Sequence, residues 1–344
     1  MEADHSARQQ LTRHNHFVPQ GYLRRWTNDG NHLFSYRTLV SHSSVPLWKL
    51  SSTRGVAFQR DLYSTFSGSK EADGLERWLA KEFEAPGMDA VQKVVDGARL
   101  KRQDWHNLIR LLAAQDVRTP RQFLESMQRW QSEMPELLER TARESLAEFT
   151  AAKRDGRQLP ISTEPNAFSD VLRVTVDRNQ SVVKSEVTLG RGLFAAQIRH
   201  ALTTTVQALK EHDWQILEPA NGHDWITSDH PVLKLNYYGA SGYDFGGGWG
   251  RRNTNLIMPL TPEHLLHTQV GTRGRRREQL SVEGTTLFQR FLAERAHRAI
   301  FANKPMDWVG EVRTRIVDAA QYEGEQRAWQ RWPIEQLASE IEAN

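Results

Sequence analysis

The spacing of apolar residues changes along the chain, and this change limits the folds that the sequence can adopt. Between about residues 71 and 153, apolar residues recur at the three- and four-residue intervals typical of buried helix faces. In the second half, short apolar runs predict strands at Trp214–Leu217, Trp225–Thr227, Val232–Tyr237, Asn255–Leu260 and Leu265–Gln269. The pattern predicts an α+β fold, with a helical bundle-like segment (about 71–153) packed with a mixed or antiparallel sheet formed largely by the second half.

Individual elements follow from local signals. Pro86-Gly87 is predicted to end the first helix of the bundle-like segment, and Thr119-Pro120 starts a later one because proline suits the first helical position. Outside this segment, a short helix is expected at Phe17–Trp26, a strand at His32–Arg37 and a helix at Thr285–Asn303.

The chain is predicted to form a single domain over residues 16–320. Residues 1–15 are polar and are expected to be a mobile arm, and residues 321–344 to be a C-terminal helix or tail. Within the domain, a polar stretch with two prolines at about 154–165 predicts a linker between the helical subregion and the sheet-rich subregion, 166–320.

Composition excludes several classes of function. The chain has no cysteine, which excludes disulfides, thiolate metal sites and a cysteine nucleophile. It has no long apolar run and no apolar segment near Met1, so we expect no membrane partner and a cytoplasmic location. The formal net charge, 45 − 42 = +3, is too small to indicate nucleic-acid binding by itself.

Arginines are nevertheless concentrated in two places. Four fall within five positions, and two more follow a glycine-rich loop: Arg273, Arg275, Arg276, Arg277, Arg251 and Arg252. Such clusters suit a nucleic-acid backbone, and the alternative is a solvated loop.

Five separated segments together resemble the DUF4238 family. They are His16-Phe17-Val18-Pro19-Gln20 with Tyr22-Leu23-Arg24 and Trp26; Glu76 with Leu79 and a later Glu82 or Glu84; Gln115 with Arg118-Thr119-Pro120; Trp214-x-Ile216-Leu217 with Trp225 through Val232; and Pro259-Leu260-Thr261-Pro262. The sequence departs from the family pattern at Trp26, where phenylalanine is common, and at His230, where asparagine is common. The family name records no assigned activity, so the resemblance implies a fold rather than a function.

The polar residues at these positions are the candidate site. His16, with His14 two residues before it, can bind a divalent metal or move a proton near neutral pH, or His16 can instead cap the following helix. Glu76 lies at the margin of a buried helix face, where a carboxylate can enter a cleft as a metal ligand or acid–base group, or turn to water.

Gln115 and Arg118 continue a buried helix face and therefore need partners. Arg118 suits a phosphate, because its planar fork donates two hydrogen bonds; the alternative is a buried ion pair with Asp116, Glu76 or Asp229. Asp229 follows an apolar strand and can ligate a metal or orient His16, or can bind backbone amides before Pro231.

Two functions remain open. The first is a nuclease or other phosphodiesterase that depends on Mg²⁺ or Mn²⁺ and acts on nucleic acid. Its catalytic site would form if five residues converge: His16, Glu76, Gln115, Arg118 and Asp229. The metal ligands would then be His14, His16, Glu76 and Asp229. The alternative is a non-catalytic binding or regulatory module, in which the same groups form a structural network. A role in bacterial defence is a further hypothesis. Common nucleotide-hydrolase and serine-hydrolase motifs are absent.

Overall fold

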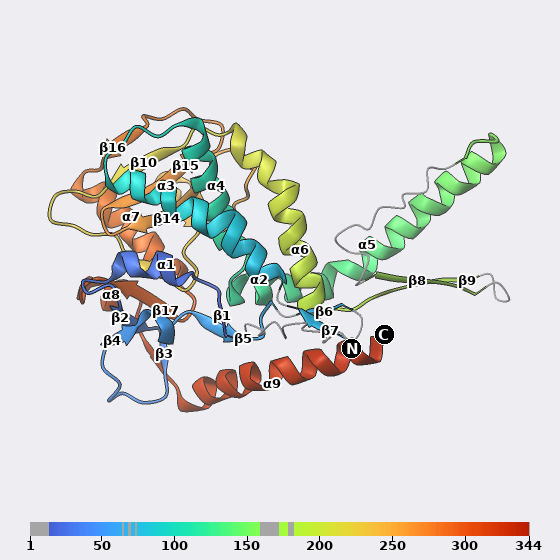
Figure 1. Cartoon of the computed structure of the whole chain (residues 1–344), viewed down its shortest axis with the longest axis horizontal. Coiled ribbons are helices and arrows are strands. Elements are labelled where there is room, and N and C mark those ends of the chain that lie inside the picture. The colour runs from blue at the N-terminus through green and yellow to red at the C-terminus, as the bar shows by residue number, and fades with distance from the viewer. Residues whose placement is uncertain are drawn as a thin grey trace, which may run out of the picture.

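The computed structural model describes residues 14–63, 65–67, 70–72, 74–158, 172–177 and 182–343. A six-stranded sheet flanked by helices lies beside a four-stranded sheet, and a long helix leaves this body as an arm (Figure 1). Residues 74–154 are largely helical and lie between the first two strands of the smaller sheet and all strands of the larger one. Neighbouring strands in the two sheets are antiparallel with one exception. The prediction of an α+β fold is confirmed.

The larger sheet comes entirely from the second half of the chain, as predicted. Its strands, in spatial order, are β13 (Tyr243–Asp244), β12 (Leu233–Tyr237), β14 (Thr254–Thr261), β15 (His264–Gln269), β10 (Gln215–Glu218) and β16 (Arg277–Gln279). Within this sheet, β10 and β16 are the one pair of neighbouring strands that is parallel. The central hairpin, β14 and β15, is almost completely buried, which requires cover on both of its faces.

Alternating side chains on β12 show what covers each face. Lys234 points to one face and donates hydrogen bonds to Asp116 on α4 (Arg102–Val117). Tyr237 points to the other face, where its ring lies 6.0 Å from that of Phe291 on α7 (Val282–Arg295). Because successive residues of a strand face opposite sides, α4 and α7 sandwich the sheet.

Helix α4 packs closely against the helix that precedes it. The elements α2 (Gly74–Leu79), a π-helical turn η3 (Ala80–Glu84) and α3 (Ala85–Val95) follow one another without a break, so the predicted stop at Pro86-Gly87 is wrong. Pro86 is tolerated because it occupies the first turn of α3. Gly87 is needed for the close approach, since a Cβ there would lie 2.7 Å from the Leu111 Cβ.

The smaller sheet joins an early part of the described chain to a late part. Its strands are β11 (Thr227–Ser228), β17 (Ala299–Ala302), β2 (His32–Arg37) and β4 (Trp48–Ser52), in that order. Beside it, β1 (His14–His16) pairs with β5 (Phe58–Arg60), and β3 (Leu39–Val40) pairs with β18 (Ile316–Val317). The strand prediction for His32–Arg37 is confirmed, whereas the helix predicted to reach Asn303 ends at Arg295 and is followed by β17.

Short elements connect this sheet to the rest of the body. The segment predicted as a helix at Phe17–Trp26 contains α1 (Gln20–Leu23) and the 3-10 turn η1 (Arg24–Trp26). Near the other end of the chain, α8 (Trp308–Val312) precedes β18. A single hydrophobic cluster extends from Phe17 to Trp332 and includes residues beside both sheets.

Helix α5 (Pro120–Arg154) forms the arm, accompanied by the hairpin of β8 (Leu172–Asp177) and β9 (Val182–Val187) (Figure 1). The chain returns to the body through α6 (Arg191–Thr203) and the 3-10 helix η4 (Thr205–Glu211), and it ends in α9 (Ala319–Ala343). Near the base of the arm, β6 (Thr65–Ser67) pairs with β7 (Lys70–Ala72).

Three of the predicted boundaries can be compared with this structure. Residues 1–13 of the predicted mobile arm and 159–165 of the predicted linker lie outside the described residues, while His14 and Asn15 belong to β1. The predicted C-terminal helix is present as α9, and its Trp332 ring packs 5.4 Å from that of Phe123 on α5.

Candidate functional site

Arg118, at the end of α4, is fully buried and is held by groups of the protein. Its Nε donates to the carbonyl oxygen of Phe17 (3.0 Å), its Nη2 donates to the carbonyl oxygen of His16, and its Nη1 pairs with Glu84. Burial works against its charge, but Glu84, with Tyr63 and Glu76, raises the pKa of Arg118 above its ordinary value. Arg118 therefore fixes the N-terminal segment against the helices, and a phosphate has no solvent path to it here.

His16 and Glu76 lie around this arginine. The His16 ring is half-buried beside Phe58, with Nδ1 at 3.5 Å from the Gln20 amide nitrogen. Glu76 is half-buried on α2. Its charge helps to raise the pKa of Arg118, and it adds to burial, the larger cause, in raising the pKa of Tyr63. The structure thus brings three predicted residues together, but the buried ion pair of Arg118 is with Glu84 and not with any of the three carboxylates that we expected.

Asp229 is engaged elsewhere. Its carboxylate accepts hydrogen bonds from the backbone amides of His297 (2.9 Å), Arg298 (2.7 Å) and Ala299 (3.0 Å). These amides lead into β17, so Asp229 fixes the start of that strand. The prediction that Asp229 binds backbone amides fits this arrangement, although the amides are about 70 residues away in the chain and not in the local turn.

Gln115 lies inside the core, one helical turn before Thr119. Its side-chain oxygen and nitrogen are buried and have no hydrogen-bond partner among the described residues. The neighbouring His230 ring is also fully buried, with Nδ1 at 2.7 Å from the Thr119 hydroxyl, and burial holds the pKa of His230 well below its usual range. Gln115 is thus remote from solvent in this conformation.

The predicted metal site finds no support within the described part of the chain. No group of three or more histidine, aspartate or glutamate side chains able to hold an ion occurs there. The side chain of His14 lies outside that part. The buried network explains why polar residues stand on apolar faces of α4, since Asp116 also accepts from Lys234 (2.8 Å) and from the Trp249 indole (2.8 Å).

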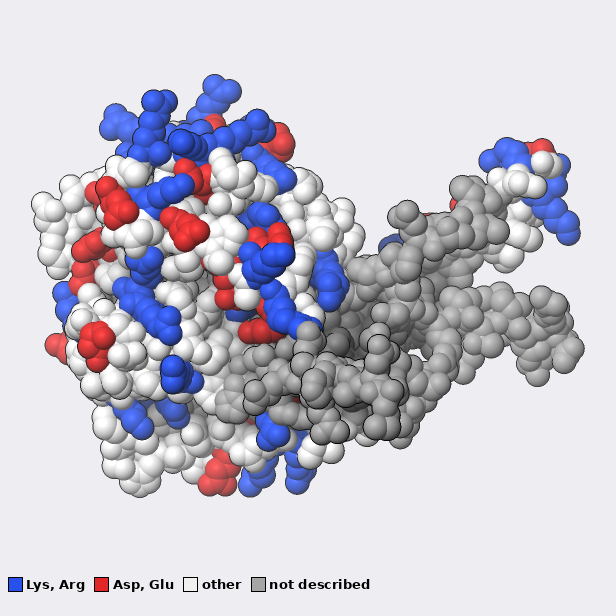
Figure 2. Space-filling view, viewed as in Figure 1, with Lys and Arg blue, Asp and Glu red and all other residues white. Residues whose placement is uncertain are grey.

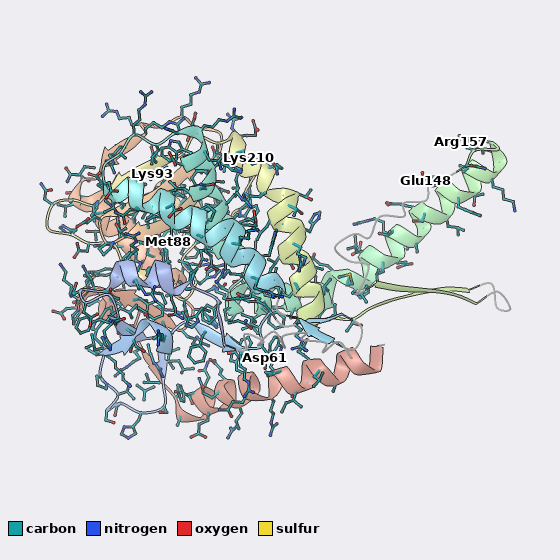
Figure 3. The ribbon with its side chains drawn as sticks, viewed as in Figure 1. Asp61, Met88, Lys93, Glu148, Arg157 and Lys210 are labelled. Atoms are coloured by element: carbon teal, nitrogen blue, oxygen red, sulfur yellow. The ribbon has the colours of Figure 1, made fainter. Side chains whose placement is uncertain are left out.

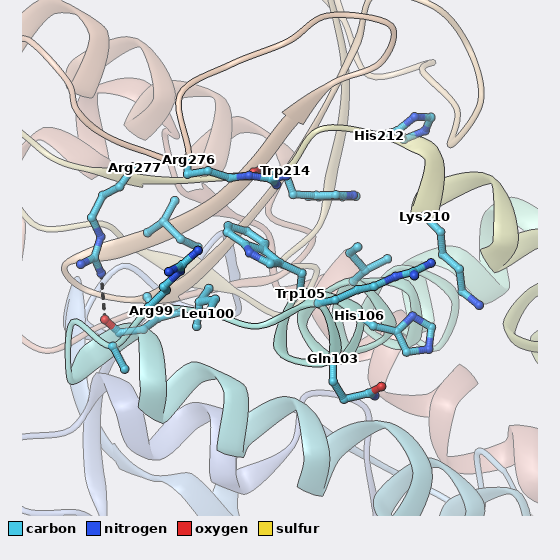
Figure 4. Close-up of a pocket in the computed structure, with 15 residues that line it drawn as sticks. Arg99, Leu100, Gln103, Trp105, His106, Lys210, His212, Trp214, Arg276 and Arg277 are labelled. Carbon is cyan, nitrogen blue, oxygen red and sulfur yellow. Dashed lines mark hydrogen bonds between the residues drawn. The ribbon is translucent and has the colours of Figure 1, made fainter.

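A large cleft lies at another position, between the helices and the edge of the six-stranded sheet (Figure 4). Its volume is about 1030 Å³, which is at the upper end of the range for ligand sites. The turn between α3 and α4, the first two turns of α4, the segment from η4 to β10, and the residues before β16 form its walls.

The cleft is lined by cations without a lining carboxylate. Five lysine and arginine residues and two histidines contribute, and no aspartate or glutamate does so among the residues that the structure describes; the basic residues are Arg99, Arg102, Lys210, Arg276, Arg277, His106 and His212. The nearest acidic partners lie outside the lining: Glu218 pairs with Arg277 (3.0 Å), and Asp213 lies 3.9 Å from Arg276.

Three of these cations are available to a ligand. The side chains of Arg99, Arg102 and Lys210 are exposed and make no ion pair or hydrogen bond within the described ranges. They reach the cleft from two elements, the α3–α4 turn with the start of α4, and η4. The charges of Lys210 and Arg102 act on His106, whose pKa lies below its ordinary value because of burial and because of Lys210, Arg110 and Arg102.

Aromatic side chains occupy the middle of the cleft. Trp105 and Trp214 lie between Arg99 and Arg277 at one end and Lys210 at the other (Figure 4). Trp214 is buried and its indole donates to the Leu209 carbonyl (2.8 Å), whereas Trp105 is only half-buried. The Arg276 guanidinium lies 5.1 Å from the centre of the Trp105 ring and donates to the Trp214 carbonyl (3.0 Å).

Two other interactions fix the walls. Arg277 donates to the carbonyl oxygen of Val94 at the end of α3 (2.8 Å), which ties the loop before β16 to the helices. His212 Nε2 donates to the carbonyl oxygen of Trp249 (2.6 Å), and the Trp249 indole donates to Asp116. Through Trp249 the glycine-rich loop is therefore fixed to both the cleft and α4.

The predicted arginine clusters meet at the same end of the molecule. Arg252 packs beside Gly271, where a Cβ would lie 3.3 Å from the Arg252 Cγ, so the loop with Arg251 and Arg252 adjoins the loop with Arg273 and Arg275. Figure 2 shows Lys and Arg side chains gathered at this end, over the region labelled β10 and β16 in Figure 1. Lys93 and Lys210 are labelled at this end in Figure 3, and Arg157 at the tip of the arm.

The structure thus extends the predicted basic patch into a cleft. Arg276 and Arg277 were predicted, while Arg99, Arg102, Trp105, His106 and Lys210 were not. The run Arg99-Leu100-Lys101-Arg102 before a helix is the sequence signal that would have indicated part of it.

Comparison with known proteins identifies one family. The DUF4238 family model, described as "Protein of unknown function", matches residues 14–306. No curated protein and no solved structure matches the chain. Within the described residues, no helix has the length and apolar character needed to cross a membrane.

Proposed function

The chain belongs to the DUF4238 family, whose description assigns no activity, and we propose from the site itself that the protein binds nucleic acid in the basic cleft. The observation that carries this proposal is the set of five Lys and Arg side chains that line a cleft of about 1030 Å³ with no lining carboxylate among the described residues. Phosphates of a nucleic-acid backbone are the polyanion that such a set suits, because each cation can replace condensed counterions.

The surroundings of the cleft support a long ligand over a small one. Arg251, Arg252, Arg273 and Arg275 extend the positive surface away from the opening, and all four are exposed. A single nucleotide would use only the cleft, whereas a strand would use the cleft and the adjoining loops.

The test is binding of fluorescein-labelled oligonucleotides, measured by anisotropy over a salt series. We expect affinity to fall steeply between about 50 and 200 mM salt. The variant Arg99→Gln/Arg102→Gln/Lys210→Gln should bind about 10- to 100-fold more weakly, and its log–log salt slope should be smaller by about two to three.

The arm provides a matched control. Arg140, Arg143 and Lys153 are exposed on α5, far from the cleft, and their replacement by glutamine changes the net charge by the same amount. This variant should bind almost like the wild type. Equal loss in both triple variants would mean that net charge and not the cleft is responsible, and no binding by the wild type would reject the proposal.

A metal-dependent nuclease is the second candidate, because three of its predicted catalytic residues, His16, Glu76 and Arg118, lie close together. It requires Mg²⁺ or Mn²⁺ as cofactor. Incubation of labelled RNA and DNA with either ion should then produce cut strands, and His16→Ala should abolish cutting. If RNA and DNA stay uncut with both ions, the nuclease is rejected and the non-catalytic binding module is left as the function. The cytoplasmic location and the role in bacterial defence stay predictions.

A further inference from the structure

We infer that Trp105 is a stacking platform for one unpaired nucleobase, so that the cleft selects single-stranded nucleic acid over a duplex. This inference rests on the proposed function and specifies its ligand. It depends on the relative positions of the half-buried Trp105 indole, the exposed Arg276 guanidinium and the cations at the two ends of the cleft.

Trp105 is suited to stacking in a way that Trp214 is not. The Trp214 side chain is 2% exposed, and its indole nitrogen is used by the Leu209 carbonyl, so Trp214 belongs to the core. Trp105 starts on the first turn of α4, is half-buried, and presents its ring to the cleft. A flat apolar ring within a cationic cleft is a surface on which another flat group can stack.

In the structure that flat group is Arg276. Its guanidinium lies 5.1 Å from the centre of the Trp105 ring, and its side chain is 63% exposed. A planar guanidinium and a nucleobase cover an indole in similar ways, since both stack on its face. Arg276 is held by one hydrogen bond to the Trp214 carbonyl (3.0 Å), and it lies 3.9 Å from Asp213 across an exposed contact. An incoming base can therefore displace Arg276 and leave it beside a phosphate.

The positions of the cations fit a strand that crosses the platform. Arg99 and Arg277 lie at one end of the cleft and Lys210 at the other, with Trp105 between them (Figure 4). A base stacked on Trp105 has its own phosphate on one side and that of the next nucleotide on the other, so both phosphates would meet a cation. His106, which adjoins Trp105 in the sequence, also lines the cleft.

A duplex cannot use this platform. Its base faces are covered by neighbouring base pairs, and only an unpaired or extruded base offers a free face to an aromatic ring. Duplex nucleic acid can reach the outer arginines but not Trp105. We therefore expect weak, salt-sensitive binding of duplexes and tighter binding of single strands.

The experiment compares a DNA single strand with a strand of the same length whose sites are abasic. Both carry the same phosphates, so only the bases differ. The wild type should bind the normal strand about 10-fold more tightly, within the range known for one base on one aromatic ring. Trp105→Leu should remove this difference while binding the abasic strand as before, and Trp105→Phe should keep most of it.

A control comes from a second arginine–tryptophan pair outside the cleft. Arg199 lies 5.7 Å from the centre of the Trp78 ring, so Trp78→Leu removes an indole of the same kind without touching the cleft. It should leave the difference between the strands unchanged. Thermal unfolding of each variant shows whether it is folded.

The outcomes separate this inference from the proposed function. If normal and abasic strands bind the wild type equally, nucleic-acid binding stands and the stacking platform is rejected. A preserved base preference in folded Trp105→Leu also rejects it. If neither strand binds, the proposed function fails, and the inference fails with it.

Discussion

Arg118 donates a hydrogen bond at 3.0 Å to the carbonyl oxygen of Phe17, a residue that lies 101 positions earlier in the chain. The same guanidinium pairs with Glu84 and binds the carbonyl oxygen of His16. One buried side chain thus connects β1, the π-helical turn η3 and the end of α4. The backbone of the family-matched segment around His16 is thereby held in place.

Replacing Arg118 by methionine should destabilise the protein strongly. The change leaves the Glu84 carboxylate and two buried carbonyl oxygens without their donor, and the loss of one partner of a buried pair costs about 3–5 kcal/mol. The measurement is the free energy of unfolding in urea, with Arg143→Met as control because its pair with Glu139 is exposed on α5. A loss below about 1 kcal/mol would contradict the structural role.

Gly87→Ala should also destabilise, although alanine is the better helix former. The added Cβ would lie 2.7 Å from the Leu111 Cβ, so α3 and α4 would have to separate. Overpacking of this kind costs about 1–3 kcal/mol, against about 1 kcal/mol gained in helix propensity. Gly310→Ala on α8 meets nothing within 4 Å and should be neutral or stabilising. The measurement is the melting temperature of both variants. Equal melting temperatures for Gly87→Ala and Gly310→Ala would contradict the close approach of α3 and α4.

The His267 imidazole makes stability depend on pH. Burial lowers the pKa of His267 from 6.5 to about 4, so below pH 6.5 the unfolded chain binds the proton more readily than the folded protein. Stability is therefore fully present above pH 6.5 and declines as pH falls towards 4. A lowering from 6.5 to about 4 corresponds to roughly 3 kcal/mol.

His267→Gln isolates this contribution. The imidazole accepts from the Gln215 amide (2.7 Å) and donates to the Asn255 side-chain oxygen (3.0 Å), and glutamine offers both kinds of group without titrating here. Urea unfolding at pH 7.5 and pH 4.5 should show a smaller loss in the variant than in the wild type. If the wild type and His267→Gln lose the same stability between the two pH values, the pH dependence comes from other groups.

Ligand binding should tighten as pH falls. The pKa of His106 lies below its ordinary value because of burial and because of Lys210, Arg110 and Arg102. A bound phosphate offsets these cations, so binding favours proton uptake, and each proton taken up can raise affinity by at most about tenfold per pH unit. Oligonucleotide affinity measured from pH 7.5 to 5.5 should show this rise, and His106→Asn should flatten it. An identical profile in that variant would exclude His106.

The strands were the easiest elements to predict. The alternation over His32–Arg37 gave the bounds of β2, and Leu265–Gln269 falls within β15. The stretch Ala299–Ala302 was wrongly assigned to a helix, because four apolar residues carry no period of their own. It becomes β17 because it pairs with β2 and because Asp229 binds the amides at its start, and neither partner is close in sequence.

The candidate site was predicted only in part for the same physical reason. Arg276 and Arg277 stood out as a local cluster, but Arg102, Trp105 and Lys210 join them only through the packing of α4 and η4 against the sheet edge. Polar residues on buried faces signalled a network, since they need partners wherever they lie. The sequence cannot show that the partner of Arg118 is Glu84, because this depends on the π-helical turn that carries Glu84.

The pairing of β2 with β17 sets an order of events during synthesis. Arg37 pairs with Ala299, which leaves the ribosome 299 − 37 = 262 residues later. At about 5–20 residues per second, the wait is on the order of 10–50 s. Over this time the nascent chain holds one edge of β2 without its native neighbour. Chaperones that shield strand edges, or slow codons placed after residue 302, should therefore affect the yield of folded protein more than its final stability.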